Sequence, residues 1–351
     1  MPRELHRQIF DTSTLEKHFV RLFHGADQPI TPSRVRFICA LALTCIRNLT
    51  LTAGLLVAVS PSAQEPRSDS TLVSIPDARA GTDSTHAVAQ NGAFVLDWLR
   101  AAEEPEPLRT TAILGVGAGF AVGEVFRRKQ DNRRLTGPFT VENDWSYTRW
   151  ADKFGHVFFA HYLSQSFATG FRWAGYDYRK AAVLGAASGF TGMLYYEVLD
   201  GFGRFENFSP IDVAANGIGA GLFAGRAYVP ALEHIHLKMS FWPSGDDCDY
   251  TCDYEGQTAW MTVNPHGFAT ESAQRYFPPW LNLAVGYGAR NGDVRFGYEE
   301  SVVYFGLDFE PAGLPIEGKL WEVLVPWLQF VHFPAPALRL SPDVGIEAFA
   351  Y

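Results

Sequence analysis

The chain has 351 residues, of which 47% are hydrophobic and 19% charged, so it can bury a large core. Its formal net charge of −9 gives no support to a nucleic-acid partner bound by neutralising phosphates. A chain of this length favours two domains behind a removable N-terminal segment.

Residues 1–63 have the character of a leader with a signal region. Arg34, Arg36 and Arg47 precede a short apolar run at residues 49–59, and small residues follow up to Ala63. A positive flank, a short apolar stretch and small residues are typical of secretion signals. Residues 64–93 are rich in Ser, Thr, Pro, Asp and Ala, and this composition predicts a disordered linker.

Residues 94–232 are expected to form a helical domain with four apolar segments, at 108–126, 150–173, 179–200 and 210–228. Small residues recur at every fourth position in each segment, as in the series Gly115, Gly119 and Gly123. Glycine costs about 1 kcal/mol per interior helical position, so such density requires compensation by close helix approach. The pattern is common in bilayers, which predicts a membrane-associated four-helix bundle with membrane lipids as partners. A soluble, tightly packed bundle is the alternative.

Residues 233–351 are expected to form a β-rich C-terminal module, which makes the predicted fold class α+β. Alternating patterns predict strands at 258–263, 281–287, 294–298 and 302–309. Asn291-Gly292 predicts a hairpin turn between two of them. Residues 320–331 predict a short amphipathic helix interrupted by Pro326.

Two cysteines lie in this module. Cys248 and Cys252 are spaced as in a small disulfide-closed loop, which suits an oxidising compartment. A zinc site is the less favoured alternative, since it would need further ligands such as His234 and His236.

Three polar motifs stand at the ends of successive apolar helices: Asp152-Lys-Phe-Gly-His156, Glu197-Val-Leu-Asp200 and Asp212-Val-Ala-Ala-Asn216. Within each motif the polar residues are three or four apart, so each pair shares one helix face. The first motif opens its helix, the second closes the next, and the third opens the one after. In an up-and-down bundle these ends meet, so we expect the carboxylates of Glu197 and Asp212 within about 8 Å of the His156 ring.

Helix capping explains some of these residues but not all. Ser209-Pro-Ile-Asp212 is a capping-box variant, and Asp152 suits the first turn of a helix. Glu197 and Asp200 close a helix against its dipole, and they require a compensating cation such as Lys153, Arg127 or Arg128.

The set as a whole suits a divalent metal such as Mg, Mn, Fe or Zn, with Asp152, His156, Glu197 and Asp212 as ligands. Lys153 and Asn216 are candidate residues for holding a bound group. A metal-free network, in which Lys153 and His156 neutralise the acids, is the alternative.

The three motifs in this order, with Ser209-Pro-Ile-Asp212 and Asn216-Gly217, resemble an uncharacterised family of predicted periplasmic lipoproteins. More distantly they are similar to VanZ-like membrane proteins. The resemblance covers roughly residues 94–351, including Tyr254-Glu-Gly-Gln-Thr-Ala-Trp260. The residues before Cys39 and Cys45 depart from the family's lipid-attachment motif. The resemblance implies a cell-envelope location, membrane-associated with periplasmic exposure, and no particular reaction.

The leading hypothesis is a non-enzymatic envelope component whose polar centre binds an ion or a ligand. The alternative is a metal-assisted hydrolase or transferase acting on an envelope lipid or glycan. Its catalytic set would be Asp152, His156, Glu197, Asp200 and Asp212, with Asp200 as the base.

Overall fold

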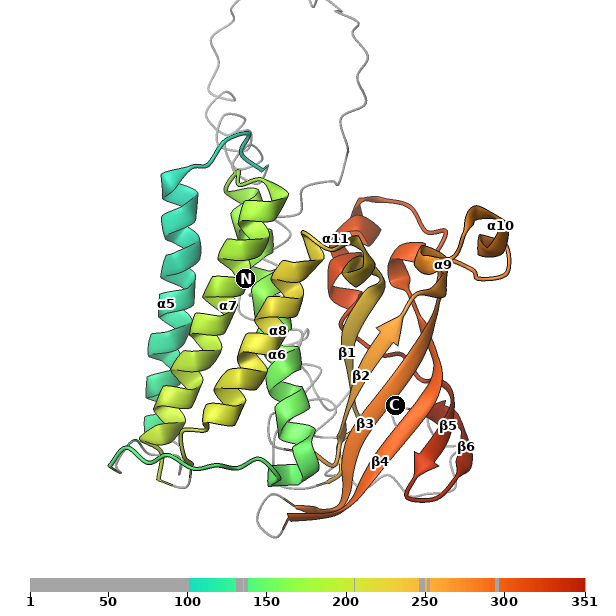
Figure 1. Cartoon of the computed structure of the whole chain (residues 1–351). Helices are drawn as coiled ribbons and strands as arrows, with labels where there is room; N and C mark the ends of the chain where they lie inside the picture. Colours follow the sequence, from blue (N-terminus) through green and yellow to red (C-terminus); the bar gives the residue numbers. More distant parts are fainter. Residues whose placement is uncertain are drawn as a thin grey trace, which may run out of the picture. The chain divides into compact units, whose positions relative to one another are not determined.

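The structure is a computed structural model, and it describes residues 101–130, 135, 138–204, 206–245, 250, 253–293 and 297–350 (Figure 1). Helices come first along the chain and an antiparallel sheet follows. This confirms the predicted mixture of helix and sheet. The leader, the linker, and Cys248 and Cys252 with their predicted disulfide lie outside the described residues.

Four long helices occupy the first half of the described chain. They are α5 (Pro107–Gln130), α6 (Ala151–Trp173), α7 (Tyr178–Gly201) and α8 (Pro210–Arg226). Their local signals are those read from the sequence: the Ser209 side chain accepts a hydrogen bond from the amide of Asp212, 3.1 Å away, and Pro210 is the first helical residue. Asp177 caps α7 in the same way by accepting from the amide of Lys180 at 2.9 Å.

Helices α6, α7 and α8 pack closely on one another, whereas α5 makes few contacts with them. Glycines account for the close packing. A Cβ atom added at Gly189 would lie 2.7 Å from the backbone nitrogen of Ser164 on α6, and one at Gly219 would lie 2.1 Å from the carbonyl oxygen of Val157. These two helices can approach α6 only because the side chain is missing.

The glycines of α5 do not make the close helix contacts that their spacing predicts. An added Cβ at Gly115, Gly119 or Gly123 would meet no atom within 4 Å. The prediction that close helix contacts compensate for the glycine series is therefore correct for α7 and wrong for α5. On α8 the close contact is made by Gly219, which lies outside the predicted series, while an added Cβ at Gly221 would meet no atom within 4 Å. A period of four residues identifies a helix face, but it does not say whether another helix covers that face.

The sheet has six strands in the order β1-β2-β3-β4-β5-β6, and each neighbouring pair is antiparallel. The strands are β1 (Ile235–Phe241), β2 (Gln257–Val263), β3 (Leu281–Asp293), β4 (Gly297–Phe309), β5 (Ala335–Ser341) and β6 (Gly345–Ala350). The remaining elements are short. Before the sheet lie η1 (Tyr147–Trp150), which precedes α6, and η2 (Pro230–His234), which precedes β1. Between the strands lie α9 (Pro265–Phe268), α10 (Glu271–Gln274), η3 (Pro311–Gly313) and α11 (Lys319–Leu328). Pro326 lies inside α11, as predicted.

The predicted hairpin turn does not interrupt β3 at Asn291-Gly292. Asn291 has the left-handed backbone (φ 57°) that such a turn favours, yet β3 continues through it and pairs Asp293 with Gly297. The strand predicted at 294–298 begins only at Gly297. Cross-strand pairing outweighs the local turn preference here.

The outward face of the sheet is apolar, and its inner face carries buried polar residues beside an apolar cluster that includes Trp260 and Tyr304. Lys238, Asn282 and Asp308 are fully buried on its inner face, and the ammonium of Lys238 lies 2.6 Å from an Asp308 oxygen. Side chains of β2, β3 and β4 that point the other way are apolar and exposed: Met261, Leu283, Val285, Phe305, Leu307 and Phe309. An antiparallel sheet with one face in water normally has the opposite arrangement.

Candidate functional site

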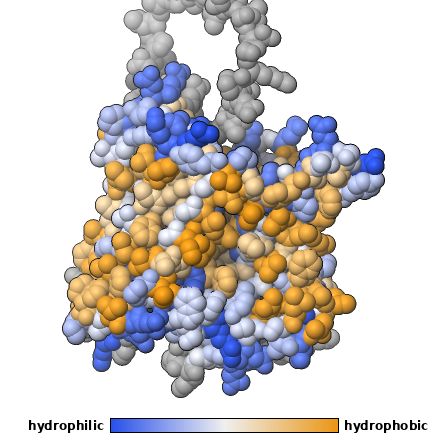
Figure 2. Space-filling model, in the orientation of Figure 1, coloured by the Kyte–Doolittle hydropathy of each residue, from blue (hydrophilic) through white to orange (hydrophobic). Residues whose placement is uncertain are grey.

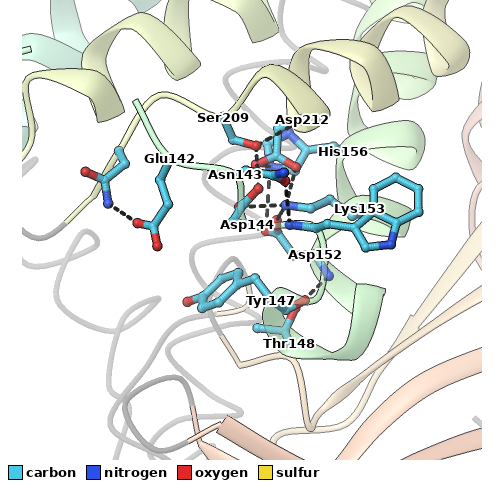
Figure 3. Close-up of polar contacts among 12 residues, drawn as sticks. Glu142, Asn143, Asp144, Tyr147, Thr148, Asp152, Lys153, His156, Ser209 and Asp212 are labelled. Carbon is cyan, nitrogen blue, oxygen red and sulfur yellow. Dashed lines mark hydrogen bonds and ion pairs between the residues drawn. The ribbon is translucent and has the colours of Figure 1, made fainter. Parts of the chain in front are cut away.

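Three helix ends bring the predicted polar residues together. The first turns of α6 carry Asp152, Lys153 and His156, the last turns of α7 carry Glu197, and the first turns of α8 carry Asp212 and Asn216. Figure 3 shows Asp152, Lys153, His156 and Asp212 turned toward one another. We call these six residues the polar centre.

Lys153 forms ion pairs with three carboxylates. Its Nζ atom lies 2.5 Å from Asp212 Oδ1, 2.8 Å from Asp152 Oδ2 and 2.7 Å from an oxygen of Asp144 (Figure 3). All four side chains are largely buried. A buried ammonium is tolerated only when carboxylates surround it in this way.

His156 contacts the remaining members. Its Nδ1 atom lies 3.3 Å from Glu197 Oε1 and 3.1 Å from the side-chain oxygen of Asn216. Its Nε2 atom lies 3.6 Å from Asp152 Oδ1 and 3.7 Å from Asp212 Oδ2. The expected approach of Glu197 and Asp212 to this ring is therefore present in the structure.

Burial and charge act against each other on the ionisable groups. Burial by itself would lower the pKa of His156, but Asp152, Asp212 and Glu197 outweigh it and raise the pKa to about 10. Burial raises the pKa of Glu197 to about 7, against the opposing charge of His156. It also raises the pKa of Asp212 to about 6. With Asp144, four carboxylates face the two cations Lys153 and His156, so the centre retains a negative excess that partial protonation relieves.

Part of the polar centre has the arrangement of a metal site. Asp152, His156 and Asp212 each offer a ligand atom, and these atoms lie within 4.8 Å of one another. Ligands around an ion bound at about 2.1 Å stand about 3 Å apart, so the group would have to contract slightly. Lys153 already binds oxygens of Asp152 and Asp212, so a metal would also have to displace its ammonium.

Asp200 does not join the polar centre, although it lies three residues after Glu197. Its carboxylate pairs with Arg128 of α5, which is 2% exposed and also contacts Glu124 (2.8 Å) and Glu206 (3.1 Å). Burial and the neighbouring Glu206 raise the pKa of Asp200 to about 8, against the charge of Arg128. Arg128 is thus the compensating cation that the end of α7 was expected to need, and the assignment of Asp200 as a base in this centre is corrected.

Two residues that touch the polar centre were not predicted from the sequence, Asp144 and Tyr254. Asp144 lies in the segment before α6 and binds Lys153, while the hydroxyl of Ser209 donates to Asp144 at 2.5 Å. Tyr254, which precedes β2, donates from its hydroxyl to Asp152 Oδ1 at 2.5 Å. The nearness of Asp144 to the first motif was an available signal, whereas Tyr254 is 102 residues away along the chain.

Comparisons with known proteins add one finding to this geometry. Residues 142–226, which contain the whole polar centre and Asp144, match the model of a family described as "Predicted periplasmic lipoprotein (DUF2279)". Searches of curated proteins and of solved structures found no match. The description agrees with the cell-envelope location, membrane-associated with periplasmic exposure, that the sequence predicts. Over these residues the chain is similar to the family of predicted periplasmic lipoproteins.

Proposed function

We propose that this protein is a non-enzymatic, membrane-associated component of the cell envelope, with a polar centre whose acids are balanced by Lys153, His156 and bound protons in place of a metal ion. The outward apolar face of the sheet supports the first part of this proposal, the association with a membrane. Its outward apolar side chains and those of α5, such as Phe120 (73% exposed), would each gain about 1.5–3 kcal/mol on leaving water. Figure 2 shows apolar residues spread over both the helices and the sheet, between hydrophilic ends.

Helix α5 is the element best suited to enter lipid. In the part of the chain that the structure describes, its span Pro107–Arg128 is the one long and apolar enough to cross a membrane. It makes few contacts with its neighbours, unlike the buried helix of a soluble core. Large apolar residues on several sides of α5 would lie against acyl chains in this arrangement.

Photolabelling tests the membrane half of the proposal. Full-length protein is reconstituted in liposomes with an apolar carbene reagent dissolved in the bilayer, and labelled peptides are identified by mass spectrometry. We expect label on α5 around Phe120 and on β4 around Phe305, and none on the buried side chain of Trp260 when peptide fragmentation resolves single residues. Attachment through the N-terminal region alone would leave α5 and β4 unlabelled, and that result would reject the proposal.

The second part of the proposal, that the polar centre is balanced without a metal ion, rests on Lys153. Its contacts with three carboxylates fill the place where a metal would bind, and together with His156 it offsets much of the acidic charge. The centre then joins three helices and the segment before β2 without needing an ion. Its remaining negative excess favours binding of a proton over any anionic ligand.

One observation supports the metal-assisted hydrolase or transferase as a second candidate. Asp152, His156 and Asp212 are grouped as metal ligands are, with Glu197 beside them. In that function a metal held by these residues would polarise an envelope lipid or glycan. Asp200 is not available as its base, because Arg128 and Glu206 hold it elsewhere.

Elemental analysis of the full-length protein, purified in detergent, separates the two candidates. The leading proposal predicts far less than one metal ion per chain in the wild type, and a lower melting temperature in Lys153→Met. The second candidate predicts about one ion per chain, lost in Asp212→Asn and retained in Lys153→Met. Stoichiometric metal in the wild type would overturn the leading proposal.

A further inference from the structure

A partly open cavity of about 140 Å³ lies at the end of the helices opposite to the polar centre. It is lined by the last turns of α6, the first turn of α7 and the end of α8, with Gln329 after α11. Its lining residues on α6 begin at Gln165, nine residues after His156, or roughly 14 Å of helix, and extend to Arg172. The cavity is thus distinct from the polar centre.

Two arginines from different helices line this cavity. Arg172 donates to the carbonyl oxygen of Tyr176 at 2.8 Å, and Arg226 donates to that of Glu233 at 3.2 Å. Among the described residues neither arginine forms an ion pair with a carboxylate, in contrast to Arg128 and Lys153. Their side chains are only partly exposed, so neither is fully hydrated. Glu310 and Glu233 act on the charge of Arg226 only from beyond ion-pair distance.

Other features of the cavity also favour an anion. Tyr178, Ala181 and Ala182 belong to the first turns of α7, where the helix dipole is positive. Gln165, Thr169, Tyr178 and Gln329 add neutral polar groups to the wall. Two guanidinium groups carry ten N–H donors between them, far more than a carboxylate can accept, whereas a phosphate group offers several acceptor oxygens.

We propose that Arg172 and Arg226 form a binding site for a phosphate group in this cavity. The group is carried either by a lipid headgroup or by free phosphate. A basic pocket between helices close to a membrane surface is a known setting for anionic headgroups. The inference goes beyond the proposed function and does not depend on it, because free phosphate probes the cavity without any lipid.

Calorimetric titration of the detergent-purified full-length protein tests the site. The probes are inorganic phosphate, dihexanoyl phosphatidic acid and uncharged dihexanoylglycerol. The variants are Arg226→Gln, Arg172→Gln and the control Arg179→Gln, whose side chain stacks on Tyr228 at the same end and does not line the cavity. All three variants lose one positive charge.

We expect at least one phosphate probe to bind, with affinity falling tenfold or more in Arg226→Gln and Arg172→Gln and less than twofold in Arg179→Gln. Tighter binding of the lipid would identify a headgroup site, and equal binding of both probes would identify a site for free phosphate. Arg226→Lys keeps the positive charge, so we expect it to retain part of the phosphate affinity and the wild-type melting temperature. That result would show that misfolding is not the cause of the lost affinity in Arg226→Gln. Absence of binding, equal binding of dihexanoylglycerol, or equal losses in all three variants would overturn the proposal.

Discussion

At the scale of single residues, the polar centre shows how neighbouring charges overcome the cost of burial. His156 would favour its neutral form in an apolar setting, yet three carboxylates hold it protonated. Lys153 is charged for the same reason, with three carboxylate oxygens within 2.8 Å. Removing one partner would leave its counterpart buried and unpaired, which is more costly than losing the pair as a whole.

The pKa of His156 leads to a prediction for stability against pH. The folded protein keeps the imidazole proton up to about pH 10, while the unfolded chain loses it near pH 6.5. Between these values the folded state binds more protons, so the free energy of unfolding falls as pH rises, by at most about 1.4 kcal/mol per pH unit. The contribution of His156 is complete below pH 6.5 and lost above pH 10.

Thermal melts of the wild type and of His156→Gln between pH 6 and 10.5 measure this effect. The wild-type melting temperature should fall more steeply over this range than that of the variant. Other groups that titrate near pH 10 are common to both proteins and cancel in the difference. Parallel curves would show that His156 is neutral in the folded state.

At the scale of helices, glycine has two different roles in this protein. On α7, Gly189 allows backbone contact with Ser164 of α6, so the glycine is needed for packing. On α5, Gly119 faces open space and lowers helix stability without a packing gain. Polar contacts help to hold α5: the ion pair of Arg128 with Asp200, and the hydroxyl of Tyr195, which donates to the carbonyl oxygen of Ala121 at 3.0 Å.

A matched pair of alanine substitutions distinguishes the two roles. Gly189→Ala should destabilise the protein by about 1–3 kcal/mol, because the new methyl group would overlap backbone atoms that cannot move away. Gly119→Ala should stabilise it by up to about 1 kcal/mol, because alanine favours a helix and meets no atom there. Denaturant melts in detergent measure both changes, and shifts of the same sign would contradict this account of the packing.

At the scale of the whole described structure, the helices and the sheet are joined at the polar centre. Tyr254 binds Asp152, and the side chain of Arg149 donates to the carbonyl oxygen of Tyr298 at 2.8 Å. The hydroxyl of Tyr287 in turn donates to the carbonyl oxygen of Arg149 at 2.5 Å. The family match ends at residue 226, so the sheet completes a site whose other members all lie within the matched region.

Tyr254→Phe tests this connection. Loss of the hydroxyl leaves a buried carboxylate with one donor fewer and should cost about 1–3 kcal/mol of stability. The control Tyr276→Phe removes a hydroxyl from a side chain that is 68% exposed and should change stability by less than about 0.5 kcal/mol. Chemical denaturation followed by circular dichroism measures the change, and equal stability of the two variants would show that the Tyr254 contact is unimportant.

The sequence by itself determined the features that depend on short-range order. Capping residues such as Ser209 and Pro210 locate a helix start within one turn of chain. Short connections between apolar helices place alternate ends together, which was enough to predict that His156, Glu197 and Asp212 meet. The alternating pattern likewise predicted strands in the second half of the chain.

Only the tertiary structure decided how each element is rotated and what covers it. Glu197 faces His156 while Asp200 faces Arg128, because a helix turns 100° per residue and only packing sets which side faces inward. A strand's period of two cannot say which face is buried, so the outward apolar face of the sheet was not foreseen. Tyr254 contacts Asp152, which lies 102 residues earlier in the chain, and no local sequence pattern predicts a contact over that separation.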